Sequence, residues 1–229
     1  MSGRATTTRL IATAAREHLK PLGLKRKGRS RLWYDDRGWS LIVVEFQASH
    51  RDGTYLNVGA MWLWRDQDYY SFDEGHRLYW RDDGRFTEEP GLGETGWTDF
   101  ADFLREHQFA EDVAMVAGIA AQRVEQLREQ FPDPCAAARY LAGRSPGRRE
   151  TPWWHAYQTG AAAVLCGDAD AARRSFGRVT VTGDDPDYAQ DLARDAADLA
   201  GLDDDGLRAR IEGTVRRTRE RLGLPPDPG

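Results

Sequence analysis

The chain has 229 residues, 40% of them hydrophobic, and a formal net charge of −5 at pH 7. This length can bury the core of one large domain or two small ones, and the composition differs from that of a disordered chain. The negative charge argues against a general nucleic-acid binder. Charged side chains interrupt the N-terminal segment, and no stretch approaches the roughly 18 apolar residues of a membrane span. We therefore expect a soluble cytoplasmic protein with no signal peptide and no membrane contact.

Residues that commonly carry metal or redox chemistry show no recognisable spacing. The two cysteines, Cys135 and Cys166, fit neither a metal motif nor a redox motif. We expect them to be buried free thiols in a reducing cytoplasm. The five histidines are scattered, and nucleotide-binding glycine loops and hydrolase motifs are missing from the sequence. The prediction is no metal and no cofactor.

The first hundred residues have the pattern of a helix followed by an antiparallel sheet. Apolar residues recur at helical spacing up to Leu19, and Pro21 and Gly23 then end the helix. Gly38 and Gly53 close two turn signals between segments rich in β-branched and aromatic residues. Strands are expected over residues 30–36, 39–48, 54–64 and 78–81. They predict a sheet of about four strands covered on one face by the first helix.

The rest of the chain has helical periodicity. Gly167 and Asp168 form a turn between two helices whose small residues favour close packing. Helices are expected over residues 98–106, 109–130, 135–142, 154–165, 169–179, 187–200 and 204–222. The predicted fold is therefore α+β, with an N-terminal sheet domain and a C-terminal region of helical hairpins. We expect the sheet domain over 1–96, a helical region packed against it over 97–224, and a disordered tail over 225–229.

One segment carries a family resemblance. It comprises the run Leu19–Gly28, with the letters LKPLGLKRKG, then Trp33-Tyr34, Val43–Ser49 and Leu56–Gly59. These residues resemble an uncharacterised bacterial domain family that opens with a helix and an LKPLGF-(K/R)-K-G turn. Leu24 stands where that family usually has Phe. Some members are similar to immunity-type proteins found beside bacterial toxins, and the resemblance implies a binding role without assigning it to particular residues.

The N-terminal segment is strongly basic. Residues 1–31 carry nine basic side chains and one acidic side chain, a net of +8. Such a patch suits an acidic protein or a phosphate group. The alternative is a solvated turn that faces the acidic remainder of the same molecule. Within this turn, Arg26 and Arg29 are the candidate charge partners.

Six of the eight tryptophans lie between residues 33 and 97. Tryptophan favours interfaces because it buries a large area and keeps one polar group. The alternative is that these rings fill the core between the sheet and its helices. Trp62, Trp64 and Trp80 are the candidate anchors for a partner.

Three polar residues stand inside expected strands. Glu45 and Gln47 share one face, because side chains alternate along a strand, and the neighbouring strand can bring Asn57 close to them. A buried carboxylate needs a partner or a shifted pKa, so this group is a candidate pocket. The alternative is a partly solvated strand end.

Together these features predict a non-catalytic cytoplasmic module, immunity- or adaptor-like, whose partner is another protein. Two alternatives stay open. One is a small-molecule enzyme with an acid–base pocket near Glu45. The other is nucleic-acid binding through the basic turn at 25–31, which the overall negative charge makes the less favoured reading.

Overall fold

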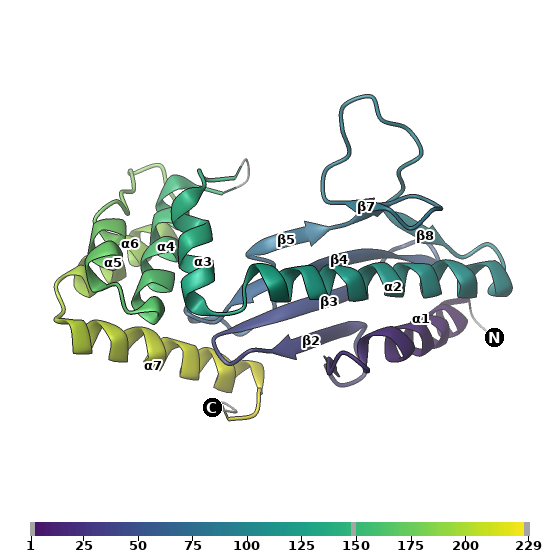
Figure 1. Cartoon of the computed structure of the whole chain (residues 1–229), viewed down its shortest axis with the longest axis horizontal. Coiled ribbons are helices and arrows are strands. Elements are labelled where there is room, and N and C mark those ends of the chain that lie inside the picture. The colour runs from purple at the N-terminus through teal and green to yellow at the C-terminus, as the bar shows by residue number, and fades with distance from the viewer. Residues whose placement is uncertain (1–2, 148–149, 227–229) are drawn as a thin grey trace. The chain divides into compact units, whose positions relative to one another are not determined.

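The computed structural model describes residues 3–147 and 150–226 (Figure 1). It confirms the α+β class, with an antiparallel sheet toward the N-terminus and helices toward the C-terminus. The chain forms two compact units, and their division differs from the expected boundary at residue 96. One unit is Met1–Trp62 with Tyr69–Glu129, and the other is Leu63–Asp68 with Gln130–Gly229. We call them the sheet unit and the helical unit.

The sheet unit contains a meander of antiparallel strands (Figure 1). Its path is β1 (Lys25–Arg26), β2 (Leu32–Asp36), β3 (Ser40–Ala48), β4 (Gly53–Trp62) and β5 (Glu74–Arg77). β2, β3 and β4 confirm the three expected long strands. β5 lies between the strands expected at 54–64 and 78–81, where no strand was expected, and it pairs with β4 from Asn57 to Ala60.

Two further elements correct the sequence-based expectations. Residues 98–106 do not form a helix, because β8 (Phe100–Asp102) pairs with the beginning of β4. The expected strand at 78–81 is the short β6 (Tyr79–Trp80), which pairs with β7 (Phe86–Thr87) in a separate two-stranded sheet. β6 and β7 form a local hairpin, whereas β8 pairs with residues that lie much earlier in the chain, from Gly53 to Tyr55. Local periodicity does not reveal this long-range pairing.

Helices α1 (Gly3–Leu19) and α2 (Glu106–Gln130) run side by side in the same direction (Figure 1). Residues early in α1 contact residues early in α2, and late residues contact late ones, as in a parallel pair. Arg9 pairs with Glu106, and a Cβ at Gly118 would lie 3.7 Å from the His18 ring. The helices cover the sheet face that carries the fully buried Val44, Phe46 and Val58. This face forms the core of the sheet unit.

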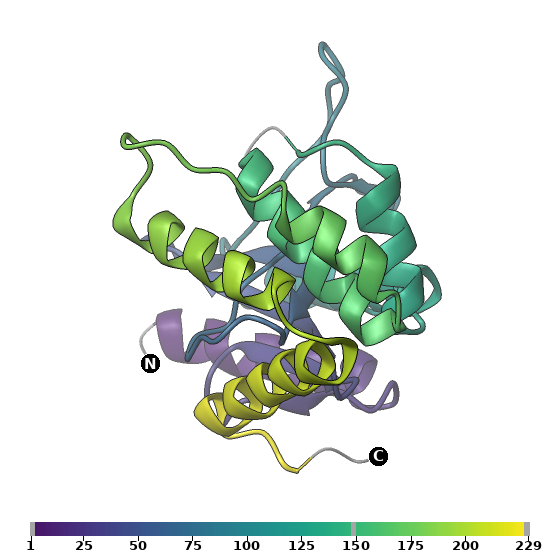
Figure 2. The ribbon, with the colours of Figure 1, turned by 90° about the vertical axis from the view of Figure 1, so that its left-hand side faces the viewer.

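The helical unit holds α3 (Pro134–Gly143), α4 (Pro152–Cys166), α5 (Ala169–Phe176), α6 (Asp187–Ala200) and α7 (Asp204–Leu222) (Figure 2). Asp168, in the expected turn, caps α5, and its carboxylate accepts a hydrogen bond from the Ala171 amide at 2.8 Å. Gly160 allows α4 to approach α5 closely, since a Cβ there would lie 2.7 Å from the Phe176 ring.

A short segment after β4 completes the helical unit. The indole N–H of Trp64 donates to Gln158 of α4, and the Thr218 hydroxyl of α7 donates to the carbonyl of Arg65 at 2.6 Å. Asp66 pairs with Arg221 at 3.2 Å. Residues 63–68 therefore pack among helices that lie far away in the sequence.

The cysteines are not free thiols. Cys135 and Cys166 form a disulfide that joins the beginning of α3 to the end of α4. Within the described ranges, no helix is long and apolar enough to cross a membrane. Of the tail expected to be disordered over 225–229, residues 227–229 lie outside the described residues, whereas the Pro225 carbonyl accepts a hydrogen bond from Arg219.

Candidate functional site

The three polar strand residues meet on the sheet face opposite the helices. Cross-strand register places Asn57 between Glu45 of β3 and Arg77 of β5. The Asn57 amide donates to Glu45 Oε2 and to Gln47 Oε1, both at 3.1 Å. The predicted proximity of these three side chains is confirmed.

Arg77, which no sequence pattern singled out, forms hydrogen bonds to this group. Its guanidinium donates to Asn57 Oδ1 at 3.3 Å, to Asp99 Oδ2 at 3.3 Å and to Gln47 Oε1. The side chains of Arg77 and Asp99 keep 29% and 32% of their surface exposed, so the network lies at the surface rather than in the core. The hydrogen bonds fix the positions of the polar groups before any ligand arrives.

Two aromatic rings lie between two arginines beside this network. The Arg77 guanidinium lies 3.8 Å from the centroid of the Tyr55 ring, and Tyr55 lies 4.7 Å from the Phe100 ring. The Arg51 guanidinium covers Phe100 at 4.2 Å. Cation–π pairs of this kind contribute roughly 0.5–1 kcal/mol each at exposed positions. We call the whole group the sheet-face cluster, and it comprises Glu45, Gln47, Arg51, Tyr55, Asn57, Arg77, Asp99 and Phe100.

Chemically, the sheet-face cluster offers recognition groups. Glu45 accepts from Asn57, and Arg77 is engaged by three oxygen acceptors. Arg51 differs, because no described residue accepts a hydrogen bond from its guanidinium, and its side chain is exposed. Arg51 can therefore bind an outside carboxylate while it remains stacked on Phe100.

The three tryptophans proposed as anchors are core residues instead. The exposed fractions of Trp62, Trp64 and Trp80 are 1%, 0% and 2%. Trp62 stacks on Trp39 with ring centroids 5.5 Å apart. Their burial corrects the expectation that these rings face a partner, because a residue without accessible surface cannot form an interface in this conformation.

The two candidate arginines of the basic turn differ in their environment. The Arg26 guanidinium donates to the carbonyls of Ser30 at 2.7 Å and Arg29 at 3.0 Å, so it stabilises the turn itself. The Arg29 side chain is exposed. Lys27 lies 3.9 Å from the centroid of the Tyr70 ring, and burial lowers its pKa. The turn is therefore partly structural, and the charge-partner role of Arg29 stays a prediction.

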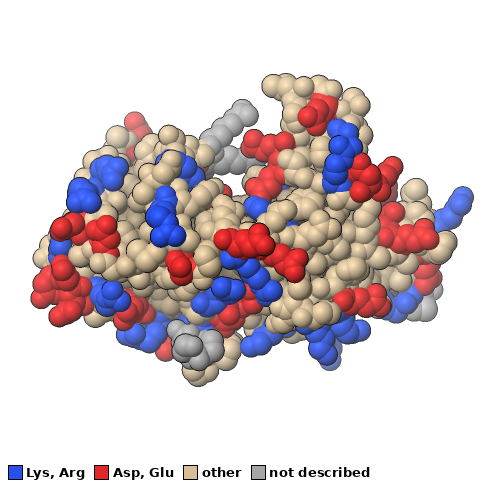
Figure 3. Space-filling model, in the orientation of Figure 1, with Lys and Arg blue, Asp and Glu red and all other residues tan. Residues whose placement is uncertain are grey.

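A loop between β7 and β8 projects from the sheet unit (Figures 1 and 3). Leu92 in this loop is fully exposed. The base is held by Glu94, which accepts hydrogen bonds from the Trp97 indole at 2.7 Å and from Arg81 at 3.4 Å. Arg81 also covers the Trp97 ring at 4.3 Å. The loop thus presents an apolar side chain above a fixed base.

Comparison with known proteins found no matching family model, no matching curated protein and no matching solved structure. Among residues 3–147 and 150–226, no three His, Cys, Asp or Glu side chains are placed to hold a metal ion. The site is therefore interpreted from its geometry.

Proposed function

We propose that this chain is a non-catalytic, protein-binding module, immunity- or adaptor-like as the family resemblance implies. The observation that supports the proposal most is the contiguous series Arg51, Phe100, Tyr55 and Arg77 on the sheet face, in which two arginines flank two aromatic rings. Tyrosine and arginine are the residue types enriched at the energetic centres of protein interfaces. The cluster supplies them in a preformed arrangement, which lowers the entropy lost on binding.

The partner is a protein that presents a carboxylate next to an apolar side chain. Arg51 has free guanidinium hydrogens for the carboxylate, and the Phe100 and Tyr55 rings are half-buried. Glu45, Gln47 and Arg77 already bind one another, which suits a rigid recognition surface better than proton transfer. The binding role thus uses the groups that remain available.

Native mass spectrometry of the protein purified gently from its own host tests this proposal. We expect a stoichiometric second polypeptide with the wild type, and its loss in Arg51→Glu and in Phe100→Ala. Removing one such interface residue typically costs about 2 kcal/mol or more, which raises Kd roughly 30-fold. Matched controls are Arg16→Glu and Tyr69→Ala, two exposed positions of the sheet unit outside the cluster.

Two results would contradict the binding proposal. The wild type would have no polypeptide companion, or the companion would remain with both cluster variants. A small bound mass instead of a polypeptide would favour the enzyme alternative near Glu45. These outcomes differ in the mass observed, so one instrument separates them.

We also propose that the module works in the cytoplasm of a bacterium. The Cys135–Cys166 disulfide makes this location testable, because stable disulfides are rare in reducing compartments. Alkylation of free thiols in intact cells, followed by mass analysis, should find both cysteines reduced in a cytoplasmic protein. A fully oxidised pair in intact cells would contradict the cytoplasmic location.

A further inference from the structure

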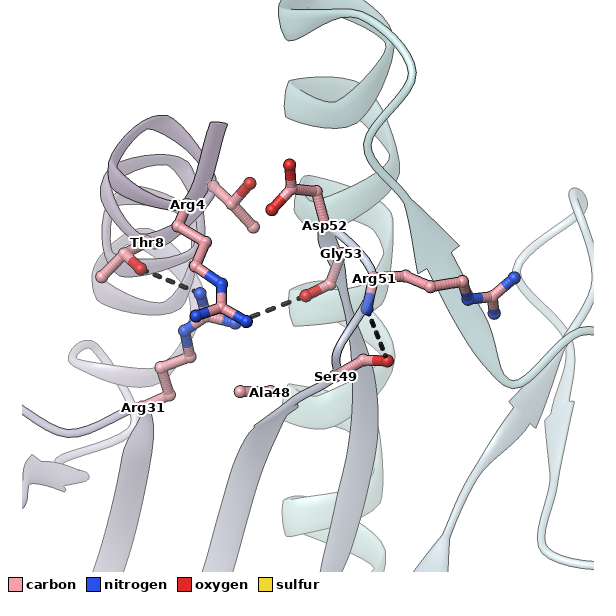
Figure 4. Close-up of a pocket in the computed structure, with 9 residues that line it drawn as sticks. Arg4, Thr8, Arg31, Ala48, Ser49, Arg51, Asp52 and Gly53 are labelled. Atoms are coloured by element: carbon pink, nitrogen blue, oxygen red, sulfur yellow. Dashed lines mark hydrogen bonds between the residues drawn. The ribbon is translucent and has the colours of Figure 1, made fainter. Parts of the chain in front are cut away.

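A second site lies on the other side of the β3–β4 turn. A pocket of about 240 Å³ opens between the first turns of α1, the residue before β2 and the β3–β4 turn (Figure 4). This volume is below the about 300–1,000 Å³ of pockets for drug-sized molecules, so a ligand must be small. Arg4, Thr7 and Thr8 line it from α1, and Arg31 lines it from the sheet side.

Two guanidinium groups meet in this pocket. The Arg31 guanidinium is held in place, since it donates to Thr8 Oγ1 at 2.8 Å and to the Gly53 carbonyl at 3.4 Å. The Arg4 guanidinium lies beside it (Figure 4). Burial, and then the positive charge of Arg4, lower the pKa of Arg31. Two like charges side by side are unfavourable unless an anion is bound between or against them.

Acidic side chains do not neutralise this pair. Among the described residues, none places a carboxylate within ion-pairing distance of Arg4 or Arg31. Asp52 lines the pocket, but its carboxylate packs against the first turn of α1, 2.5 Å from where a Cβ on Gly3 would lie. Figure 4 shows the Asp52 carboxylate beside the first turn of α1, apart from both guanidinium groups. The pocket is therefore cationic.

The third arginine of the pocket does not add to this charge. The Arg51 side chain points away from the cavity in Figure 4 and stacks on Phe100. Its backbone amide donates to Ser49 Oγ at 3.2 Å, so the Ser49 hydroxyl lies toward the Arg51 backbone and away from Arg4 and Arg31 (Figure 4). The Thr8 hydroxyl, which accepts from Arg31, can still donate its own hydrogen, so a hydroxyl donor stands beside the two guanidinium groups. This combination suits a group with several acceptor oxygens.

We infer that this pocket binds a phosphate group, either the free ion or the phosphate of a small monoester. Two guanidinium groups match the charge of a phosphate dianion, and their planar N–H pairs match its oxygens. The pocket holds a phosphate and few further atoms, given its volume of about 240 Å³. The site involves neither the exposed Arg29 nor the sheet-face cluster side chains, so it is independent of the proposed function.

Isothermal titration calorimetry at low ionic strength tests the inference with inorganic phosphate, ethyl phosphate and acetate. We expect saturable one-to-one binding of at least one phosphate, at least about tenfold tighter than that of acetate. Arg4→Gln and Arg31→Gln should each weaken it by about tenfold or more. Arg16→Gln is the matched control, because it removes the same charge from an exposed position of the same helix.

Arg4→Gln keeps the test informative if Arg31→Gln fails to fold. Arg31 bonds to Thr8 and Gly53, so its loss can disturb the fold, whereas Arg4 makes no such described hydrogen bond. Tighter binding of ethyl phosphate assigns a monoester, and binding of inorganic phosphate alone assigns the free ion. The inference is overturned if neither phosphate binds, or if Arg16→Gln weakens binding as much as Arg4→Gln does.

Discussion

The buried pair Trp64–Gln158 makes the clearest prediction about stability. The Trp64 ring is fully buried, and its indole N–H donates to Gln158, which is 2% exposed. The Gln158 Nε2 atom has no hydrogen-bond partner among the described residues. Trp64→Phe removes the donor, leaves an unpaired amide oxygen and opens a small cavity. We expect it to lower the free energy of unfolding by about 2–4 kcal/mol.

Gln158→Met should lower the free energy of unfolding by less than Trp64→Phe does, because it removes the acceptor of the indole N–H but also removes the unpartnered amide nitrogen. In the double variant only the cavity remains. Its loss should therefore be about 1–2 kcal/mol smaller than the sum of the single losses. Urea unfolding followed by far-ultraviolet circular dichroism measures all four proteins. If the loss in the double variant equals the sum of the two single losses within about 0.5 kcal/mol, the reasoning is refuted. Trp97→Phe is the control with a small expected loss, because the Trp97 ring is half-buried and bonds to the exposed Glu94.

Three further outcomes follow from single contacts. Gly160→Ala should destabilise the protein by about 1–3 kcal/mol, because its new Cβ clashes with the Phe176 ring. Gly118→Ala should stabilise the protein by up to about 1 kcal/mol, because its new Cβ would lie 3.7 Å from the His18 ring. Thermal unfolding compares the two variants, and an equal effect would contradict the close approach at Gly160. Burial first, and then Tyr34 and Asp36, raise the pKa of Tyr70 to about 12 from 10.0, so the folded state favours the neutral phenol and stability should fall as pH rises from 10.0 toward 12. Ultraviolet titration of tyrosinate should show this late ionisation and lose it in Tyr70→Phe. Reduction of the disulfide, whose cysteines are 31 residues apart, should lower the free energy of unfolding by about 3–4 kcal/mol, with no such reductant effect in the Cys135→Ser/Cys166→Ser variant.

Local signals predicted the fold well where neighbouring residues determine the structure. Gly38, at φ 79°, and the cap at Asp168 depend on the backbone within a few residues. The same holds for α1 and for the strands β2, β3 and β4. Strand β8 escaped prediction because its three residues are held by pairing with β4, about fifty residues earlier in the chain.

The tryptophans show where alternation stops being informative. Trp62 and Trp64 share a face only while the strand continues, and β4 ends at Trp62. Trp64 instead enters the helical unit and bonds to Gln158. Similarly, Glu45, Gln47 and Asn57 were predictable as a group from strand register, but Arg77 was not, because its strand lies beyond an irregular segment. Tyr55 and Asn57 share one face of their strand because side chains alternate, and this was the one sequence signal that could have added Tyr55 to the site.

The two proposed sites lie on opposite sides of the turn at residues 49–53 and use different side chains. Arg4 and Arg31 supply the guanidinium groups of the cationic pocket, whereas the Arg51 guanidinium lies on Phe100 in the sheet-face cluster. A substitution of the Arg51 side chain therefore changes the cluster and leaves the pocket's two guanidinium groups in place. Conversely, Arg4→Gln changes the pocket and removes no atom of the cluster. Each proposal can fail without the other, because partner capture depends on Arg51 and Phe100 while phosphate binding depends on Arg4 and Arg31.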